Sequence, residues 1–227
     1  MSDKNCYPNT NILINKANIK NQKQLDEFES VMFNLSLIKM QEEGFVIKSV
    51  YDLFNIHKIL FGEVYEWAGN KRTVNIFKEE LVLNGLSVNY EDFNYIDKSF
   101  SDLNKEYNEL NWESNKIIDE LIVLFAKMWK IHPFREGNTR SVVVFLYFLA
   151  KQNNLELDTK LIGDNAKYFR NALVMASIDE YSESNYLNKI LKDALNKNND
   201  NKENKYKTVN NIEMENYKYN YHVIKKS

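Results

Sequence analysis

The sequence predicts an all-α fold with one small β-hairpin. Only six glycines and two prolines punctuate its 227 residues, while leucine, isoleucine, phenylalanine, glutamate and lysine recur at helical spacing. One stretch, residues 71–88, instead alternates β-branched and aliphatic residues with polar ones, which is typical of short strands. The length fits a single domain followed by a tail.

Two helices are expected before that stretch. The first spans residues 22–44, where Gly44 supplies a stop signal and the apolar stripe consists of Leu25, Phe28, Met32, Leu35 and Ile38. The second lies within residues 47–67, and the residues in step along it are Val50, Leu53, Phe54, His57 and Phe61.

The hairpin is expected at residues 72–88, because Asn84 and Gly85 form the dipeptide that most favours a tight turn between strands. A helix from about residue 90 to 110 follows. Residues 115–131 then form another helix, whose broad apolar face contains Ile118, Leu121, Leu124, Phe125, Met128 and Trp129.

The longest apolar run, residues 141–150, is about half of the roughly 20 residues that a membrane span needs. It indicates a buried helix and no membrane partner. The net charge of −2 also argues against a nucleic-acid partner. Cys6 is the only cysteine, and no apolar signal segment opens the chain, so a cytoplasmic location is expected.

Residues 196–227 begin with a tract rich in asparagine, lysine and acidic residues, and then regain tyrosine, isoleucine and valine. We interpret this part as a polar linker and a short C-terminal element. Residues 1–195 form the domain proper.

Residues 132–140, HPFREGNTR, interrupt the helical pattern. The proline that follows His132 should leave this histidine extended at a helix end, and Phe134 can anchor the loop in the core. Gly137 and Asn138 tolerate unusual backbone angles just before the next helix. A turn of this kind can aim several N–H groups at an anion, to which Arg140 adds charge-assisted hydrogen bonds.

Within the same loop, Glu136 is a candidate Mg²⁺ ligand and His132 a candidate general base. Each residue alone would more often be structural: a helix-end histidine, a solvated carboxylate, a plain turn. Their joint spacing favours a phosphate-handling site.

This motif resembles the signature HPFx[D/E]GN[G/K]R of the Fic (filamentation induced by cAMP) family. Residues 7–19, 62–78 and 172–195 are also similar to segments of that family, so the resemblance covers roughly residues 7–195. It implies a Fic-type helical domain with the motif between two central helices. It also implies that the hairpin is a flap that docks a target segment by strand addition, its target-facing part being Thr73, Val74, Asn75, Ile76, Phe77 and Lys78.

The activity that the resemblance implies is protein adenylylation. His132 would deprotonate a serine, threonine or tyrosine hydroxyl of a target protein, which attacks the α-phosphate of ATP and expels pyrophosphate. Glu136 would hold Mg²⁺ or Mn²⁺, and Gly137, Asn138, Thr139 and Arg140 would bind the phosphates.

The sequence departs from the family pattern at two positions. Thr139 replaces the usual glycine, and Val143 stands where a second arginine is typical. These departures keep two alternatives open: a catalytically weak or inactive Fic-type binding or antitoxin module, and a Fic enzyme that uses another nucleotide or phosphate donor. Partners would then include an antitoxin or a second copy of the chain.

The inhibitory motif [S/T]xxxE[G/N] of regulated family members has its nearest counterpart at residues 211–216, with Glu215 and Asn216 in place. A tail helix that only packs against the domain is the favoured reading, and inhibition by these two residues is the alternative.

Overall fold

A computed structural model describes residues 4–178 and 182–195. The predicted linker and C-terminal element, with Glu215 and Asn216, lie outside the described residues. Within them the elements are α1 (Gln22–Glu43), α2 (Asp52–Phe61), the 3-10 turn η1 (Leu81–Leu83), α3 (Ile96–Asn108), α4 (Ile117–Ile131), α5 (Asn138–Gln152), α6 (Thr159–Asp164), α7 (Ala166–Met175) and α8 (Asn185–Leu195).

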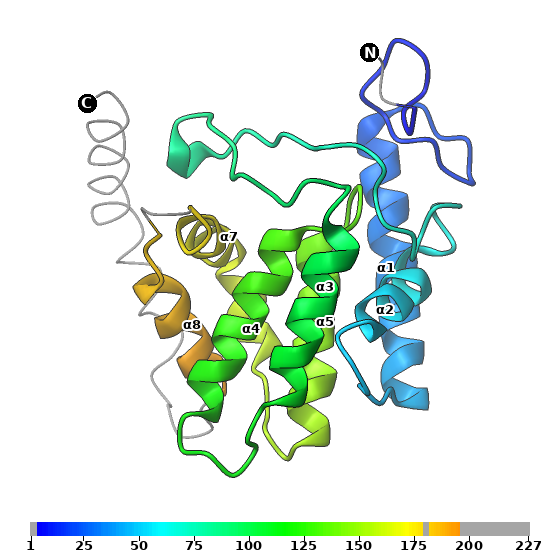
Figure 1. Ribbon diagram of the computed structural model, residues 1–227. Coiled ribbons are helices and arrows are strands. Elements are labelled where there is room, and N and C mark those ends of the chain that lie inside the picture. The colour runs from blue at the N-terminus through cyan, green and yellow to red at the C-terminus, as the bar shows by residue number, and fades with distance from the viewer. Residues whose placement is uncertain (1–3, 179–181, 196–227) are drawn as a thin grey trace, which may run out of the picture.

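The fold is a bundle of helices around α4 and α5 (Figure 1). These two helices contact each other and are joined by the loop 132–137 at one end of the bundle. Helix α2 packs on α5 and α1 on α2, while α3 and α8 pack on α4. Both central helices bury most of their side chains, as their nearly continuous apolar sequences predict. No helix in the described part of the chain is long and apolar enough to cross a membrane.

Helix α1 begins and ends where the sequence predicts, with the Asn21 side chain capping its first turn and Gly44 following its last residue at φ 75°. The predicted apolar stripe is wrong in its second half, because Leu35 and Ile38 are more than half exposed. The buried face is turned toward Glu29, which is 9% exposed and pairs with a side chain of α5. The buried face of α1 therefore contains a charged residue, Glu29, which apolar periodicity alone would not place there.

Helix α3 begins at Ile96, about six residues later than the expected start. The preceding residues serve other contacts: the Tyr90 ring packs against His132, and the Glu91 carbonyl accepts a hydrogen bond from Arg72. These contacts hold residues 90–95 as a loop.

The predicted β-hairpin is not found, since the described residues contain no β-strand and only one isolated bridge, between Cys6 and Leu13. The turn residues behave as expected, with Asn84 at φ 54° and Gly85 at φ 86°. Val82 and Leu83 are both buried beside each other, which breaks the alternation of a strand and forms η1 instead. The two arms meet at the turn through two backbone hydrogen bonds, from Glu80 N–H to the Leu86 carbonyl and from Gly85 N–H to the Glu80 carbonyl.

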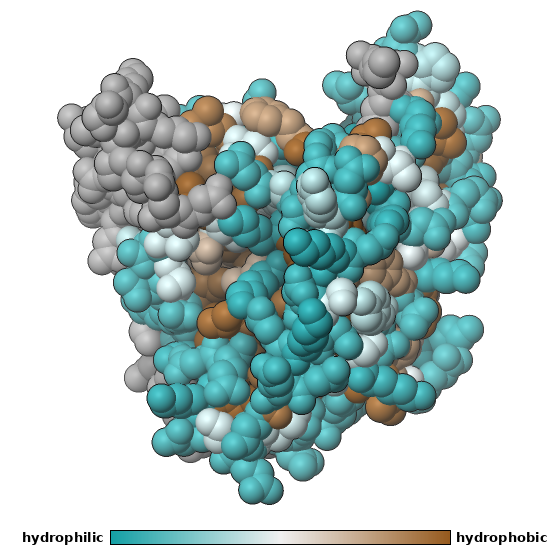
Figure 2. All heavy atoms as spheres, viewed as in Figure 1, coloured by the Kyte–Doolittle hydropathy of each residue, from teal (hydrophilic) through white to brown (hydrophobic). Residues whose placement is uncertain are grey.

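Residues 72–88 therefore form a strap that crosses the end of the bundle where the 132–137 loop lies (Figure 1). The face seen in Figure 2 is largely hydrophilic, with apolar residues along the upper edge where the strap runs. Two apolar side chains of the strap are strongly exposed, Phe77 at 68% and Leu81 at 78%.

Candidate active site

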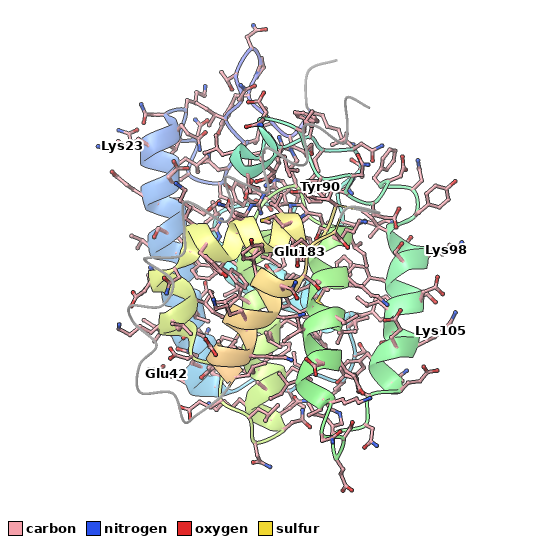
Figure 3. The ribbon with its side chains drawn as sticks, turned by 90° about the vertical axis from the view of Figure 1, so that its left-hand side faces the viewer. Lys23, Glu42, Tyr90, Lys98, Lys105 and Glu183 are labelled. Carbon is pink, nitrogen blue, oxygen red and sulfur yellow. The ribbon has the colours of Figure 1, made fainter. Side chains whose placement is uncertain are left out.

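The chemistry predicted for residues 132–140 is concentrated at one end of the bundle. Figure 3 shows Tyr90 at the same end of the helices as Lys23 and Lys98, with Glu42 at the opposite end. The Tyr90 ring lies 4.0 Å from the ring of His132. This end of the molecule brings together the loop, the strap and the segment that precedes α3.

His132 is fully buried and its side chain is held in one orientation. Its Nδ1 lies 3.1 Å from the Trp129 carbonyl oxygen, and because a carbonyl can only accept, Nδ1 carries the proton. Nε2 is then unprotonated, and it has no hydrogen-bond partner. Burial, with the positive charges of Lys78 and Arg170, lowers the pKa of His132 well below its ordinary value. The imidazole is therefore a neutral base at physiological pH.

The backbone of His132 differs from the extended conformation expected before a proline. Its φ of 52° and ψ of 60° are left-handed, which is unfavourable for a residue with a Cβ. The side-chain bond to the Trp129 carbonyl, one turn back, curls the residue toward the helix. The guanidinium of Arg72 stabilises the same end, donating from Nε to the His132 carbonyl (2.9 Å) and from Nη2 to that of Ile131 (3.5 Å). Arg72 thus caps α4 with a positive charge.

The loop interior is held by Asn138 and His57. The Asn138 side chain accepts from the Phe134 N–H (2.9 Å) and donates to the Phe134 carbonyl (2.8 Å), which leaves one amide hydrogen for a ligand. Phe134 is fully buried, as predicted. The His57 ring stacks on it at 3.8 Å and its Nε2 lies 3.0 Å from the Glu136 carbonyl. His57 therefore positions the backbone of the residue predicted to bind metal.

Gly137 gives the loop its turn into α5. Its φ is 79°, and a Cβ built there would lie 2.6 Å from two ring atoms of Phe61, so both backbone angle and space require glycine. The first intrahelical hydrogen bond of α5 is made by the Ser141 N–H to the Gly137 carbonyl (3.0 Å). The N–H groups of Asn138, Thr139 and Arg140 precede it, so the helix N-terminus presents three amides that can bind an anion.

Glu136 faces the strap. Its Oε2 lies 3.2 Å from Lys78 Nζ and its Oε1 accepts the Gly137 N–H at 3.1 Å. Burial alone would raise the pKa of Glu136, but the charge of Lys78 and the Gly137 hydrogen bond outweigh it, and the pKa is lowered. The carboxylate is therefore ionised. No cluster of three or more histidine, cysteine, aspartate or glutamate side chains in the described residues could enclose a metal.

Arg140 is directed toward α1. Its Nη2 lies 2.5 Å from Glu29 Oε1, whose other oxygen accepts from the Tyr65 hydroxyl at 2.5 Å. The guanidinium also lies over the Phe61 ring, at 4.7 Å. Arg140 is thus half-exposed but firmly placed at one side of the α5 N-terminus.

Thr139 and Val143, the two departures from the family signature, have different surroundings. The Thr139 hydroxyl accepts hydrogen bonds from Trp129 Nε1 (2.9 Å) and from Arg170 Nη1 (3.0 Å). Val143 lines a cavity of about 280 Å³, together with Thr139, Arg140 and mainly apolar residues such as Phe33. No second guanidinium projects from the Val143 position, and the wall there is apolar.

The predicted target-facing residues, 73–78, run along the outer part of the strap. Exposed and partly buried positions alternate strictly from residue 73 to residue 79, as they would in a strand at a sheet edge. In this stretch Lys78 N–H donates to the Ser87 hydroxyl (3.2 Å), and Asn75 is anchored to Asp92 at 2.7 Å. The segment has the exposure pattern of a strand without a partner strand among the described residues.

Several residues of the site were not predicted from the motif: Glu29, His57, Arg72, Tyr90 and Arg170. A signal for two of them is present in the composition, because only four of the 30 basic residues are arginine. Arg135 and Arg140 lie in the motif, while Arg72 and Arg170 both donate to it, to His132 and to Thr139. Because arginine is rare in this chain, the positions of its four arginines are a sequence signal for residues of the site.

Comparisons with known proteins give consistent matches. The model of the Fic/DOC family matches residues 48–150. The probable protein adenylyltransferase y4lH of Sinorhizobium fredii is 34% identical over 180 residues, which cover 77% of this chain and 88% of that protein. The type IV secretion system effector protein BepA is 27% identical with a TM-score of 0.73, covering 85% of this chain and 68% of that one. The BepC protein from Bartonella tribocorum, solved with bound AMPPNP, is 23% identical with a TM-score of 0.68, covering 84% and 95% of the two chains.

Proposed function

The chain belongs to the Fic/DOC family, and on that premise we propose that it is a protein adenylyltransferase that transfers AMP from ATP to a hydroxyl group of another protein. One observation carries the proposal: the free, unprotonated Nε2 of His132 lies in the loop that leads directly into the N-terminal amides of α5. This arrangement supports the proposal, because the base and the phosphate-binding amides would then lie on one short loop.

The base step uses the orientation of His132. A serine, threonine or tyrosine hydroxyl of the target donates its proton to Nε2 as its oxygen attacks the α-phosphate, and pyrophosphate leaves. The Trp129 carbonyl, which accepts from Nδ1 (3.1 Å), stabilises the imidazolium that forms. The Tyr90 ring lies tilted against the imidazole, and because His132 is fully buried, the side chains around it must shift to admit the hydroxyl.

The phosphates are received by backbone N–H groups. Those of Asn138, Thr139 and Arg140 meet at the positive end of the α5 dipole, and Gly137 makes the turn that leads into them. The remaining amide hydrogen of Asn138 adds one donor. Because these groups are fixed by the fold, they can stabilise negative charge without reorganisation.

The residues present fit a divalent cation of the Mg²⁺ type. This ion is commonly bound by one carboxylate together with substrate phosphates, and Glu136 is a single ionised carboxylate beside the anion site. Glu136 would hold Mg²⁺ or Mn²⁺, whose charge would offset that of the phosphates. Lys78 must release Glu136 for this to occur.

Residues 73–78 are the proposed docking segment for the target. Their alternating exposure suits main-chain pairing with an extended peptide, which would place a target hydroxyl near the strap and His132.

Transfer of label from ATP tests the proposal. With lysate proteins, Mg²⁺ and ATP labelled at the α-phosphate, the wild-type protein should label a target and His132→Ala should not. ATP labelled at the γ-phosphate should leave the same background label with the wild-type protein as with His132→Ala, because adenylyl transfer releases that phosphate in pyrophosphate. γ-Label that depends on the wild-type protein, or equal α-labelling by His132→Ala, would contradict adenylyl transfer by this base.

A second function, a Fic-type binding module with little or no catalysis, is favoured by two ion pairs. Lys78 neutralises Glu136, and Glu29 neutralises Arg140, so the predicted metal and phosphate ligands are both engaged within the chain. Calorimetry separates the two functions: an enzyme should bind Mg-ATP, whereas the module should show no binding heat with it.

A further inference from the structure

Arg170 lies on α7, thirty residues beyond the motif, yet its guanidinium contacts the motif directly. Nη1 donates to Thr139 Oγ1 at 3.0 Å, and the guanidinium carbon lies 4.9 Å from the centre of the Trp129 ring. Trp129 in turn packs edge-on against His132, with ring centroids 5.3 Å apart. Arg170 is therefore next to both the base and the start of α5.

The Thr139 side chain fixes this position. Its hydroxyl oxygen accepts from Trp129 Nε1 (2.9 Å) as well as from Arg170, so both lone pairs are used and the hydroxyl hydrogen remains available to donate. The N–H of the same residue is one of the three amides at the helix N-terminus. Arg170 is thus attached to a residue of the anion site itself.

Two guanidiniums lie beside the N-terminus of α5. Arg140 pairs with Glu29 of α1 and lies over the Phe61 ring, while Arg170 belongs to α7 and donates to Thr139. At Val143 the wall of the adjoining cavity is mainly apolar. Arg170, on α7, is therefore a second guanidinium that contacts the start of α5.

The acidic partner of Arg170 is on the strap. Arg170 Nη2 pairs with Glu80, which is buried and also accepts from the Tyr90 hydroxyl at 3.2 Å. The strap thus makes two ion pairs across the site with opposite polarity, because its Lys78 binds Glu136 and its Glu80 binds Arg170. A bound cation would compete with Lys78 for Glu136, and a phosphate anion would compete with Glu80 for Arg170.

We propose that Arg170 is a phosphate-binding residue of the donor site, held in place by Thr139, which exchanges its ion pair with Glu80 for a phosphate oxygen of the nucleotide. This inference rests on the proposed function and adds a residue to it. The residue type supports it, since a guanidinium presents a planar fork to phosphate in a chain where only four of 30 basic residues are arginine.

Calorimetry with a non-hydrolysable ATP analogue and Mg²⁺ tests the inference without any transfer step. The full chain is compared with Arg170→Gln, Glu80→Gln and the control Lys167→Gln, which removes one positive charge from an exposed position of the same helix. Arg170→Gln should weaken binding by about tenfold or more, as expected for losing a hydrogen bond to a charged group. Lys167→Gln should leave the Kd unchanged, and Glu80→Gln should tighten binding because the competing charge is gone.

The outcomes separate the inference from the function. If the wild-type protein binds the analogue but Arg170→Gln binds equally well, the inference is wrong and the function stands. If Glu80→Gln weakens binding or leaves it unchanged, the ion-pair exchange is wrong, and this measurement decides the matter even if Arg170→Gln fails to fold. Absence of binding by the wild-type protein would overturn both the inference and the proposed function.

Discussion

His57→Phe is expected to destabilise the fold at neutral pH while keeping the shape of the site. The phenyl ring can still stack on Phe134, but the Gly69 N–H (2.9 Å to Nδ1) and the Glu136 carbonyl (3.0 Å to Nε2) both lose their partner. An unpaired buried polar group costs about 1–3 kcal/mol. Because the Glu136 carbonyl is only partly buried, we expect a total loss of roughly 2–4 kcal/mol in the free energy of unfolding.

The same substitution should change how stability depends on pH. Burial lowers the pKa of His57 from 6.5 to about 4. Between these values the unfolded chain binds a proton that the folded chain does not, so wild-type stability falls as pH falls from 6.5 toward 4. At 1.36 kcal/mol per pH unit this amounts to roughly 3 kcal/mol, and phenylalanine removes this contribution. The penalty of the variant should therefore shrink strongly in acid.

Denaturant unfolding at pH 7.5 and pH 4.5 measures both effects, with the slope m confirming that the same surface is exposed. A penalty below about 1 kcal/mol at pH 7.5, well under the cost of two unpaired groups, would refute the role given to His57. A penalty that is equal at the two pH values would refute the assignment of a neutral, buried imidazole.

Four further substitutions, at three positions, test the loop and its contacts. Gly137→Ala should lower the free energy of unfolding by about 2–5 kcal/mol, from strained backbone and overlap with an aromatic ring, and should abolish nucleotide binding; a stable variant that binds normally would contradict this. Lys78→Gln should tighten Mn²⁺ binding, measured by calorimetry with the ATP analogue, because Glu136 loses its competing cation; an unchanged Kd would count against competition. Thr139→Val should weaken nucleotide binding and Thr139→Ser should not, because only the hydroxyl holds Arg170; unchanged binding by Thr139→Val, or an equal loss with Thr139→Ser, would contradict this role of the hydroxyl.

The helical fold was largely predictable because the interior helices are apolar at nearly every buried position. The end of α1 was predicted from Gly44, but its buried face was not, since Glu29 is drawn inward by the arginine and tyrosine that it binds. Apolar periodicity cannot identify a face that contains an ion pair between distant segments.

The strap shows a second limit. Alternation and the Asn84-Gly85 turn suggested strands, and the turn formed with the expected backbone angles. The strands did not form because Glu80 is directed inward to Arg170 and the neighbouring Val82 and Leu83 are both buried. Contacts with residues 90 positions away determined the conformation.

The motif alone predicted the candidate site, because His132, Glu136 and Gly137 lie within six residues and their chemistry follows from their types. The supporting residues are Glu29 of α1, His57 of α2, Arg170 of α7 and Arg72 of the strap. None of them lies in a sequence motif that points to the site. Only the arginines carried a visible signal, through their scarcity.

The identity of the transferred group tests the central claim most directly. Lysate proteins would be incubated with Mg²⁺, a panel of nucleoside triphosphates and either the wild-type protein or His132→Ala, and modified peptides would be identified by mass spectrometry. The account predicts AMP on a serine, threonine or tyrosine hydroxyl, formed from ATP by the wild-type protein alone. A different transferred group, or the same adduct formed by His132→Ala, would contradict it.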